Sequence, residues 1–139
     1  MYQHILLAAD GSENSVRAAY EAIKLAKCLP SSIIEVVMVT DFDKSKQDIL
    51  HAQSSESLLL ERKRKLSNVE QLLNSEQVKY RITFLKGSPG PEIVRYANEQ
   101  KVDLLVIGSR GLNGLQEMVL GSVSHKVMKR VHCPALIVK

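Results

Sequence analysis

Short runs of apolar residues recur along the chain, and longer segments with helical spacing separate them. The runs are rich in aliphatic and β-branched residues and are bounded by turn-forming residues, a pattern typical of strands buried on both faces. The third run alternates between polar and apolar residues, as a half-exposed strand does. We predict strands at residues 5–9, 33–39, 80–85, 104–107 and 135–138.

The segments between these runs predict helices. Ser12 is placed to cap the first helix, and Pro91 suits the first turn of the third. The expected buried positions are Val16, Ala19, Tyr20, Ile23 and Ala26; Leu59, Leu66, Val69 and Leu73 on one longer helix; Ile93 and Ala97; and Val123, Val127 and Val131. Strands that alternate with helices indicate an α/β fold, an open parallel sheet with helices on both faces. The polar stretch at residues 43–57 is expected to be a mobile connection or the frayed start of a helix.

Length and composition support one globular domain over residues 1–139, because 45% of the residues are hydrophobic and 24% are charged. The net charge of +4 comes largely from residues 62–65, which read Arg-Lys-Arg-Lys. Acidic residues flank this run and no aromatic residue interrupts it. We therefore interpret it as the solvated face of a helix, not as a nucleic-acid site.

The sequence carries no recognisable targeting or metal-binding signal. No secretory signal and no apolar run of membrane-spanning length are present, so we expect a cytoplasmic protein without a membrane partner. Cys28 and Cys133 are then expected to be reduced, with Cys28 as a small buried residue. The histidines have no metal-ligand spacing.

Candidate chemistry follows the predicted strands, because ligands of open parallel sheets bind beyond the carboxyl ends of the strands. The loop after the fourth strand has glycines at 108, 111 and 121. These glycines allow positive φ and let backbone N–H groups approach a ligand. Gly121 and Ser122 precede the last helix, whose N-terminus suits a phosphate, and the hydroxyls of Ser122 and Ser124 could add hydrogen bonds. A tight turn capped by Ser122 is an equally good explanation on physical grounds.

The spacing Gly108-x2-Gly111-x9-Gly121-Ser122 differs from the Walker A loop and from the dinucleotide fingerprint. It resembles the ATP-binding signature of the universal stress protein family (UspA-like). The resemblance extends over nearly the whole chain, and further matching blocks lie at residues 5–12, 87–89, 102–108 and 133–138. Met38-Val39-Thr40 stands where many family members have His-Val.

The resemblance implies a five-stranded sheet of order 3-2-1-4-5, similar to the adenine nucleotide alpha hydrolase-like fold, with ATP as the ligand. Asp10 would lie near the ribose and phosphates, although helix capping is its alternative role. The backbone of Val39 would meet the adenine edge, or Val39 would be plain core. Ala8 and Ile107 would line the adenine pocket. The expected cradle for ribose and triphosphate is Gly108, Gly111, Gly121, Ser122, Val123 and Ser124.

Three functions remain open at this point. No nucleophile–base pair is recognisable, so we favour an adenine-nucleotide-binding regulatory protein with at most slow ATP hydrolysis. A nucleotide-free structural or signalling dimer is the second possibility. The third is an enzyme, an ATPase or nucleotidyl transferase that uses Asp10 and Arg110. Asp10 and Asp41 could also share a Mg²⁺ that enters with the triphosphate.

Pairing of two chains is expected at the last strand, where an apolar edge invites association. The resemblance implies a homodimer through Ala135, Leu136, Ile137 and Val138.

Overall fold

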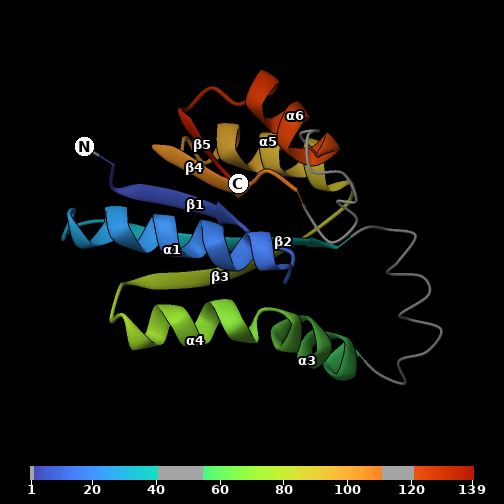
Figure 1. Ribbon diagram of the computed structural model, residues 1–139. Coiled ribbons are helices and arrows are strands. Elements are labelled where there is room, and N and C mark those ends of the chain that lie inside the picture. Colours follow the sequence, from blue (N-terminus) through green and yellow to red (C-terminus); the bar gives the residue numbers. More distant parts are fainter. Residues whose placement is uncertain (1, 41–54, 111–120) are drawn as a thin grey trace.

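The computed structural model describes residues 2–40, 55–110 and 121–139. Five parallel strands form one sheet in the order β3-β2-β1-β4-β5, as expected (Figure 1). The strands are β1 (His4–Ala8), β2 (Ile33–Thr40), β3 (Tyr80–Lys86), β4 (Leu104–Gly108) and β5 (Ala135–Val138). The helices of the described residues are α1 (Glu13–Lys27), α3 (Ser55–Lys65), α4 (Ser67–Ser75), α5 (Pro89–Glu99) and α6 (Ser122–Arg130).

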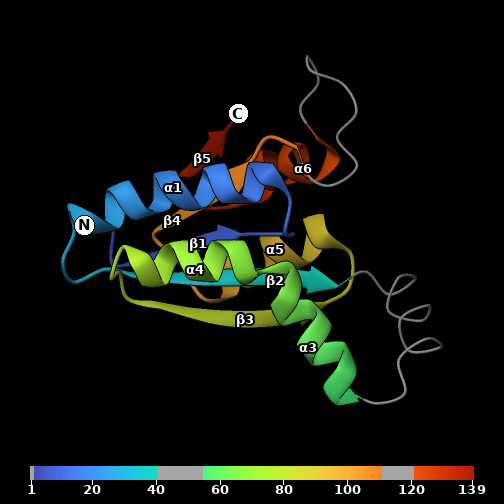
Figure 2. The ribbon, with the colours of Figure 1, turned by 60° about the horizontal axis from the view of Figure 1, so that its bottom comes forward.

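Helices cover both faces of the sheet. Helices α1, α3 and α4 lie on one face and α5 and α6 on the other (Figures 1 and 2). Alternate strand residues feed two separate cores: Leu7 and Val36 pack toward α1 and α4, whereas Leu6 and Val37 pack toward α5 and α6. The central strands β1 and β4 are buried along almost their whole length, which explains their uninterrupted apolar sequence.

The first and third helices begin as predicted. The side chain of Ser12 caps α1 by accepting a hydrogen bond from the backbone N–H of Ser15, and proline opens α5. One expected core residue of α1 is not buried, because Tyr20 is 49% exposed.

The predicted longer helix is divided in two at Leu66. Leu66 lies between α3 and α4, yet backbone hydrogen bonds of helical type continue from Leu66 to Arg62 and from Glu70 to Leu66. Leu66, Val69 and Leu73 are buried against the sheet, whereas Leu59 and Leu60 on α3 are exposed. Helix α3 therefore turns away from the sheet at its carboxyl edge (Figure 2). The described part of the predicted mobile stretch, residues 55–57, belongs to α3.

Two sequence interpretations are wrong. Cys28 is exposed at the C-terminal cap of α1, because the chain leaves the helix there. Arg62 is only 9% exposed, so the basic run is not uniformly solvated; Lys63, Arg64 and Lys65 are exposed. No helix in the described ranges is long and apolar enough to cross a membrane.

Candidate functional site

The carboxyl ends of β1 and β4 lie side by side, because Ala8 pairs with Ile107. In this strand order, the connection from β1 leads to β2 on one side, and that from β4 leads to β5 on the other. The boundary between β1 and β4 is thus the topological switch point, where ligands of such sheets bind. Of the expected site residues, all but Gly111 are among the described residues. They lie at or just after the carboxyl ends of β1, β2 and β4, or at the start of α6.

A compact turn fixes Asp10 after β1. Its Oδ1 accepts a hydrogen bond from the backbone N–H of Ser12 at 2.9 Å and from the hydroxyl of Ser15 at 2.7 Å. The same Ser15 hydroxyl accepts the backbone N–H of Asp10 at 2.8 Å. Asp10 is therefore held beside the N-terminus of α1, whose N-cap residue is Ser12, and it lies at the switch point.

Gly11, the next residue, needs to be glycine. Its φ is +88°, and a Cβ there would lie 2.7 Å from the carbonyl oxygen of Lys65. This contact joins the end of α3 to the turn that holds Asp10.

Gly108 ends β4 between two helices. A Cβ at Gly108 would lie 2.8 Å from the Cβ of Asn14 on α1. On the other side, the hydroxyl of Ser124 donates a 2.6 Å hydrogen bond to the carbonyl oxygen of Gly108. Ser124 is 2% exposed. The hydroxyl that we expected to bind phosphate thus donates to the backbone of β4, and it positions the first turn of α6.

Backbone hydrogen bonds bring together the residues on either side of the glycine-rich segment. The N–H of Gly121 donates to the carbonyl oxygen of Ser109 at 2.8 Å, and the N–H of Ser109 donates to the carbonyl oxygen of Val138 at 2.7 Å. The φ of Gly121 is −60°, and Gly108 is not among the glycines with positive φ. Positive φ was therefore the wrong reason for these two glycines; close packing is the right one. Gly111 and residues 112–120 lie outside the described residues.

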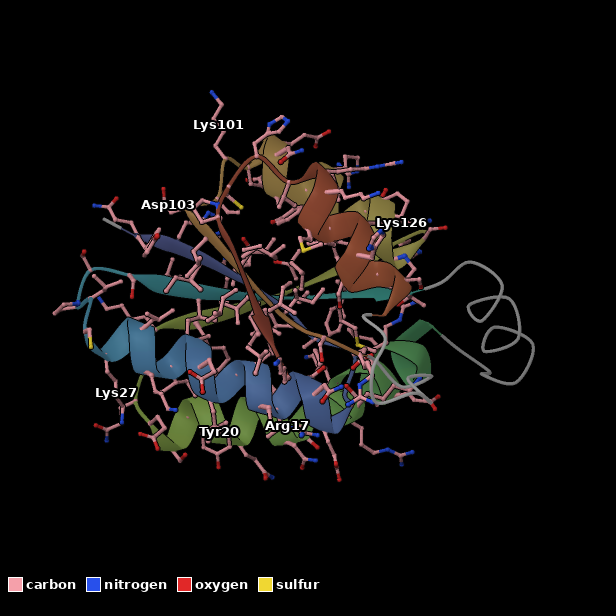
Figure 3. The ribbon with its side chains drawn as sticks, turned by 45° about the horizontal axis from the view of Figure 1, so that its top comes forward. Arg17, Tyr20, Lys27, Lys101, Asp103 and Lys126 are labelled. Carbon is pink, nitrogen blue, oxygen red and sulfur yellow. The ribbon has the colours of Figure 1, made fainter. Side chains whose placement is uncertain are left out.

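The N-terminus of α6 faces this edge. Gly121 is its N-cap residue without a side-chain cap, and no acidic residue occupies its first turn. Ser122 is exposed, Val123 is half-buried and Ser124 is buried. The backbone N–H groups of a helix N-terminus and the positive end of its dipole favour an anion here. Lys126, one turn later, packs against Gly90 and adds positive charge at the same edge (Figure 3).

The expected base-binding residues share one face of the sheet. Ala8, Val39 and Ile107 all belong to the core beneath α5 and α6. The carbonyl of Val37 accepts the N–H of Ala9, so β2 turns the backbone groups of Val37 toward β1. Val39, two residues later, has the same orientation, but β1 has ended at Ala8. The backbone of Val39 therefore points to the side where a planar base would lie.

Sequence analysis missed Asn14 and the buried position of Arg62. Asn14 is 8% exposed, and its Nδ2 donates to the carbonyl of Arg110 at 2.7 Å. No motif marks Asn14, because its role follows from the packing of α1 against β4. The burial of Arg62 could have been predicted, because it precedes Leu66, Val69 and Leu73 on one helical stripe of the sequence.

Other reactive groups lie away from this edge. Burial raises the pKa of the Cys133 thiol, which disfavours the reactive thiolate. No group of three metal-binding side chains occurs within residues 2–40, 55–110 and 121–139. Asp41, the expected partner of Asp10 at a Mg²⁺, lies outside those ranges.

Comparisons with known proteins find relatives of the same fold. A protein 37% identical over 141 aligned residues, the universal stress protein MJ0531 of Methanocaldococcus jannaschii, is matched over 100% of this chain and 83% of its own length. The solved structure of the hypothetical protein MJ0577 is 30% identical and has a TM-score of 0.84, with 100% of this chain and 96% of that chain covered.

Two more distant structures share the fold. One is a universal stress protein in complex with cAMP, 24% identical with a TM-score of 0.71, and coverage is 99% of this chain and 96% of that one. The other is the universal stress protein of Archaeoglobus fulgidus in complex with dAMP, 20% identical with a TM-score of 0.73 and coverage of 99% and 98%. The model of the universal stress protein family matches residues 1–139, and the chain therefore belongs to that family.

Proposed function

We propose that this protein binds an adenine nucleotide, with ATP as the expected ligand, and acts as a nucleotide-dependent regulator in the stress response. One observation carries the proposal. The 2.6 Å hydrogen bond from Ser124 to Gly108 brings the N-terminus of α6 to the end of β4, beside the turn that holds Asp10. An anion-binding helix end and a fixed carboxylate thereby meet at the switch point of the sheet.

The arrangement suits each part of a nucleotide. The phosphates would lie at the backbone N–H groups that begin α6, near Gly121 and Ser122. The ribose hydroxyls would lie near Asp10, and the base would lie against Ala8, Val39 and Ile107. Gly111 stays a predicted member of the phosphate cradle. Mg²⁺ would enter with the triphosphate.

Relatives of known structure support an adenine ligand. Structures of universal stress proteins have been solved in complex with cAMP and with dAMP, and both share this fold. The preference for ATP over those ligands rests on the glycine spacing.

Binding is favoured over catalysis by the surroundings of Asp10. Its Oδ1 accepts hydrogen bonds from both Ser12 and Ser15, which fixes the carboxylate in one orientation and suits a binding contact. A cytoplasmic location stays a prediction.

The direct test is to purify the protein, release bound small molecules by heat and identify them, and then titrate ATP by calorimetry. Gly121→Val is the matched variant, because even a Cβ at Gly121 would lie 3.0 Å from the carbonyl oxygen of Ser109. We expect nucleotide with the wild type and little or none with the variant. A wild type that carries none and does not bind added ATP would overturn the proposal.

We also propose that two copies pair through β5. The carbonyl of Pro134 accepts a hydrogen bond from Leu105 in β4, and that of Val138 accepts one from Ser109, just after β4. The backbone groups of Ala135 and Ile137 therefore point toward the open edge. An edge strand of four apolar residues, each half-buried, is suited to continue the sheet into a second copy.

A further inference from the structure

Arg62 is a buried cation for which the described part of the chain provides no partner. Its side chain is 9% exposed, and Nε and Nη2 are buried and make no hydrogen bond there. These two nitrogens form the lateral fork of the guanidinium group, whose parallel N–H groups match the two oxygens of a phosphate or carboxylate. A buried charge without a partner is strongly unfavourable, so its retention calls for an acceptor outside the described chain.

The fork lies at the same edge as the candidate nucleotide site. Arg62 precedes the buried residues Leu66 and Val69 on one helical stripe, so its side chain leaves the helix on the side that faces the sheet. It lies one helical turn, or about 6 Å, further toward the carboxyl edge than Leu66. Lys65, its near neighbour in α3, contacts Gly11 in the turn that holds Asp10.

A second polar group without a partner lies on the same face. Thr40 ends β2 and is 9% exposed, and its Oγ1 has no hydrogen-bond partner within the described ranges. Side chains alternate along β2, and Met38 belongs to the core beneath α1 and α4. Thr40 therefore shares the face of Arg62, opposite to Val39. Asn14 Oδ1, also buried and without a partner in those ranges, adds a third such atom, on α1 beside Gly108.

Different parts of the nucleotide would lie on different faces of the sheet. The phosphate end at α6 and the base pocket of Ala8, Val39 and Ile107 belong to the α5–α6 face, whereas Arg62 and Thr40 belong to the opposite face. Asp10, expected beside the ribose, is bonded to the start of α1 and so lies on the Arg62 side. A group that reaches Arg62 must therefore project from the ribose and not from the 5′ phosphate chain.

We propose that Arg62 and Thr40 bind a second phosphoryl group, carried on the 2′ or 3′ oxygen of the nucleotide ribose. The site would then prefer ribose-phosphorylated adenine nucleotides to those with a 5′ phosphate alone. In dinucleotide-binding folds an arginine beside the ribose accommodates a 2′-phosphate, whereas an acidic residue holds a free hydroxyl. The phosphoryl group would therefore be carried on the ribose oxygen that faces Arg62, and the other oxygen would stay a free hydroxyl beside Asp10. This inference rests on the proposed nucleotide-binding function, and it adds the substrate class of the same site.

The test compares adenosine 5′-phosphate with adenosine 2′,5′-bisphosphate and adenosine 3′,5′-bisphosphate by calorimetry at constant ionic strength. The three ligands differ only in the ribose phosphate. We expect at least one bisphosphate to bind wild-type protein about tenfold more tightly or better, because a bidentate charge-assisted pair forms. The 2′ and 3′ ligands identify which oxygen carries the group.

Three variants complete the test. Arg62→Met should abolish the preference and leave affinity for adenosine 5′-phosphate unchanged, and Thr40→Val should reduce the preference. Arg64→Met, an exposed residue of the same basic run, is the matched control and should keep it.

Each other outcome has a distinct meaning. Wild-type protein that binds all three ligands equally overturns this inference and leaves the proposed function standing. Wild-type protein that binds none of them, and no ATP, overturns both. If the preference for a bisphosphate survives Arg62→Met, the assignment to Arg62 is overturned. The assignment is also overturned if Arg64→Met removes the preference, because the preference would then reflect the overall positive charge of the run.

Discussion

The hydroxyl of Ser124 lies 2.6 Å from the carbonyl oxygen of Gly108 and joins the first turn of α6 to the end of β4. Both residues are buried, so water cannot readily replace this hydrogen bond. The contact sets where the N-terminus of α6 points, and hence where an anion would bind.

Ser124→Ala tests that relationship. Loss of the donor leaves the buried carbonyl of Gly108 unsatisfied, and we expect the free energy of unfolding to fall by about 1–3 kcal/mol. Nucleotide affinity should fall as well, because the first turn of α6 loses its anchor. Urea denaturation and calorimetric titration measure the two effects. Ser122→Ala, at an exposed neighbour, is the control for stability; an equal loss of stability there would contradict the assigned role.

Ser122→Asp separates helix stability from ligand binding. A carboxylate at the start of α6 complements the helix dipole, so the unfolding free energy should rise by about 0.3–1 kcal/mol. The same charge should repel phosphate and weaken ATP binding about tenfold or more, whereas binding of uncharged adenosine should change little.

The matched control for Ser122→Asp is Ser88→Asp. Ser88 is the exposed N-cap of α5 at the same edge and likewise has no side-chain cap hydrogen bond. We expect Ser88→Asp to change stability in the same direction and to leave ATP affinity nearly unaltered. Equal losses of ATP affinity in both variants would mean that the phosphates do not lie at α6.

The strands and their order with the helices were predictable because burial on both faces demands uninterrupted apolar runs. The residues of β4 are all buried, and its sequence is accordingly an uninterrupted run without polar side chains. The strand order came from the family resemblance, and the structure confirms it. Helix termini with local chemistry, such as the Ser12 cap, were predictable for a different reason: the residue that signals the cap and the group it contacts lie within a few residues of each other.

Contacts between distant segments were not predictable in this way. Gly108 must be glycine because Asn14 passes close to it, and nothing in the local sequence shows that approach. Arg62 was grouped with three exposed neighbours because charge was considered as a run. Its position on the stripe of Leu66 and Val69 decides its burial instead. Charge and helical period have to be considered together to find such a residue.

Gly108→Ala tests the close approach of α1. The added Cβ would lie 2.8 Å from the Cβ of Asn14 and 3.1 Å from its backbone oxygen, so α1 must shift. We expect a loss of about 1–3 kcal/mol in the unfolding free energy, together with weaker nucleotide binding because the turn at Asp10 moves with α1. Gly90→Ala is the control, since its nearest neighbour is the flexible side chain of Lys126 at 3.1 Å. Equal stability of the two variants would contradict the packing explanation.

Glu35 predicts how stability depends on pH. This carboxylate is 1% exposed in the central part of β2. Burial by itself raises the pKa of Glu35, but hydrogen bonds from Arg81, Tyr96, Thr83 and His4 outweigh it and hold the pKa at about 2 rather than 4.5. Because the folded-state pKa is depressed, the stabilisation is complete above the unfolded-state pKa. It is lost as pH falls from about 4.5 through 2, by up to about 3 kcal/mol.

Glu35→Gln should remove this part of the pH dependence. We expect lower stability at pH 7 and a flatter decline of unfolding free energy between about pH 5 and pH 2, measured by urea denaturation. Glu13→Gln, at a side chain 96% exposed, should behave like the wild type. ATP affinity at pH 7 should be unchanged, because this network does not include the site residues. A Glu35→Gln curve parallel to that of the wild type would refute the assignment.

Ile137→Pro tests pairing through β5 without breaking the sheet inside one chain. The N–H of Ile137 points toward the open edge, because the alternate residues Pro134 and Val138 accept hydrogen bonds from Leu105 and Ser109 on the β4 side. Proline is tolerated on an edge strand where the N–H faces outward, so the chain should stay folded, with a normal circular dichroism spectrum. We expect the wild type to sediment as a dimer and the variant as a monomer at the same concentration.

Leu136→Pro is the control, because the N–H of Leu136 faces β4. This variant should instead lower the unfolding free energy markedly. A wild type that sediments as a monomer, or a Ile137→Pro variant that stays dimeric, would exclude pairing through this edge.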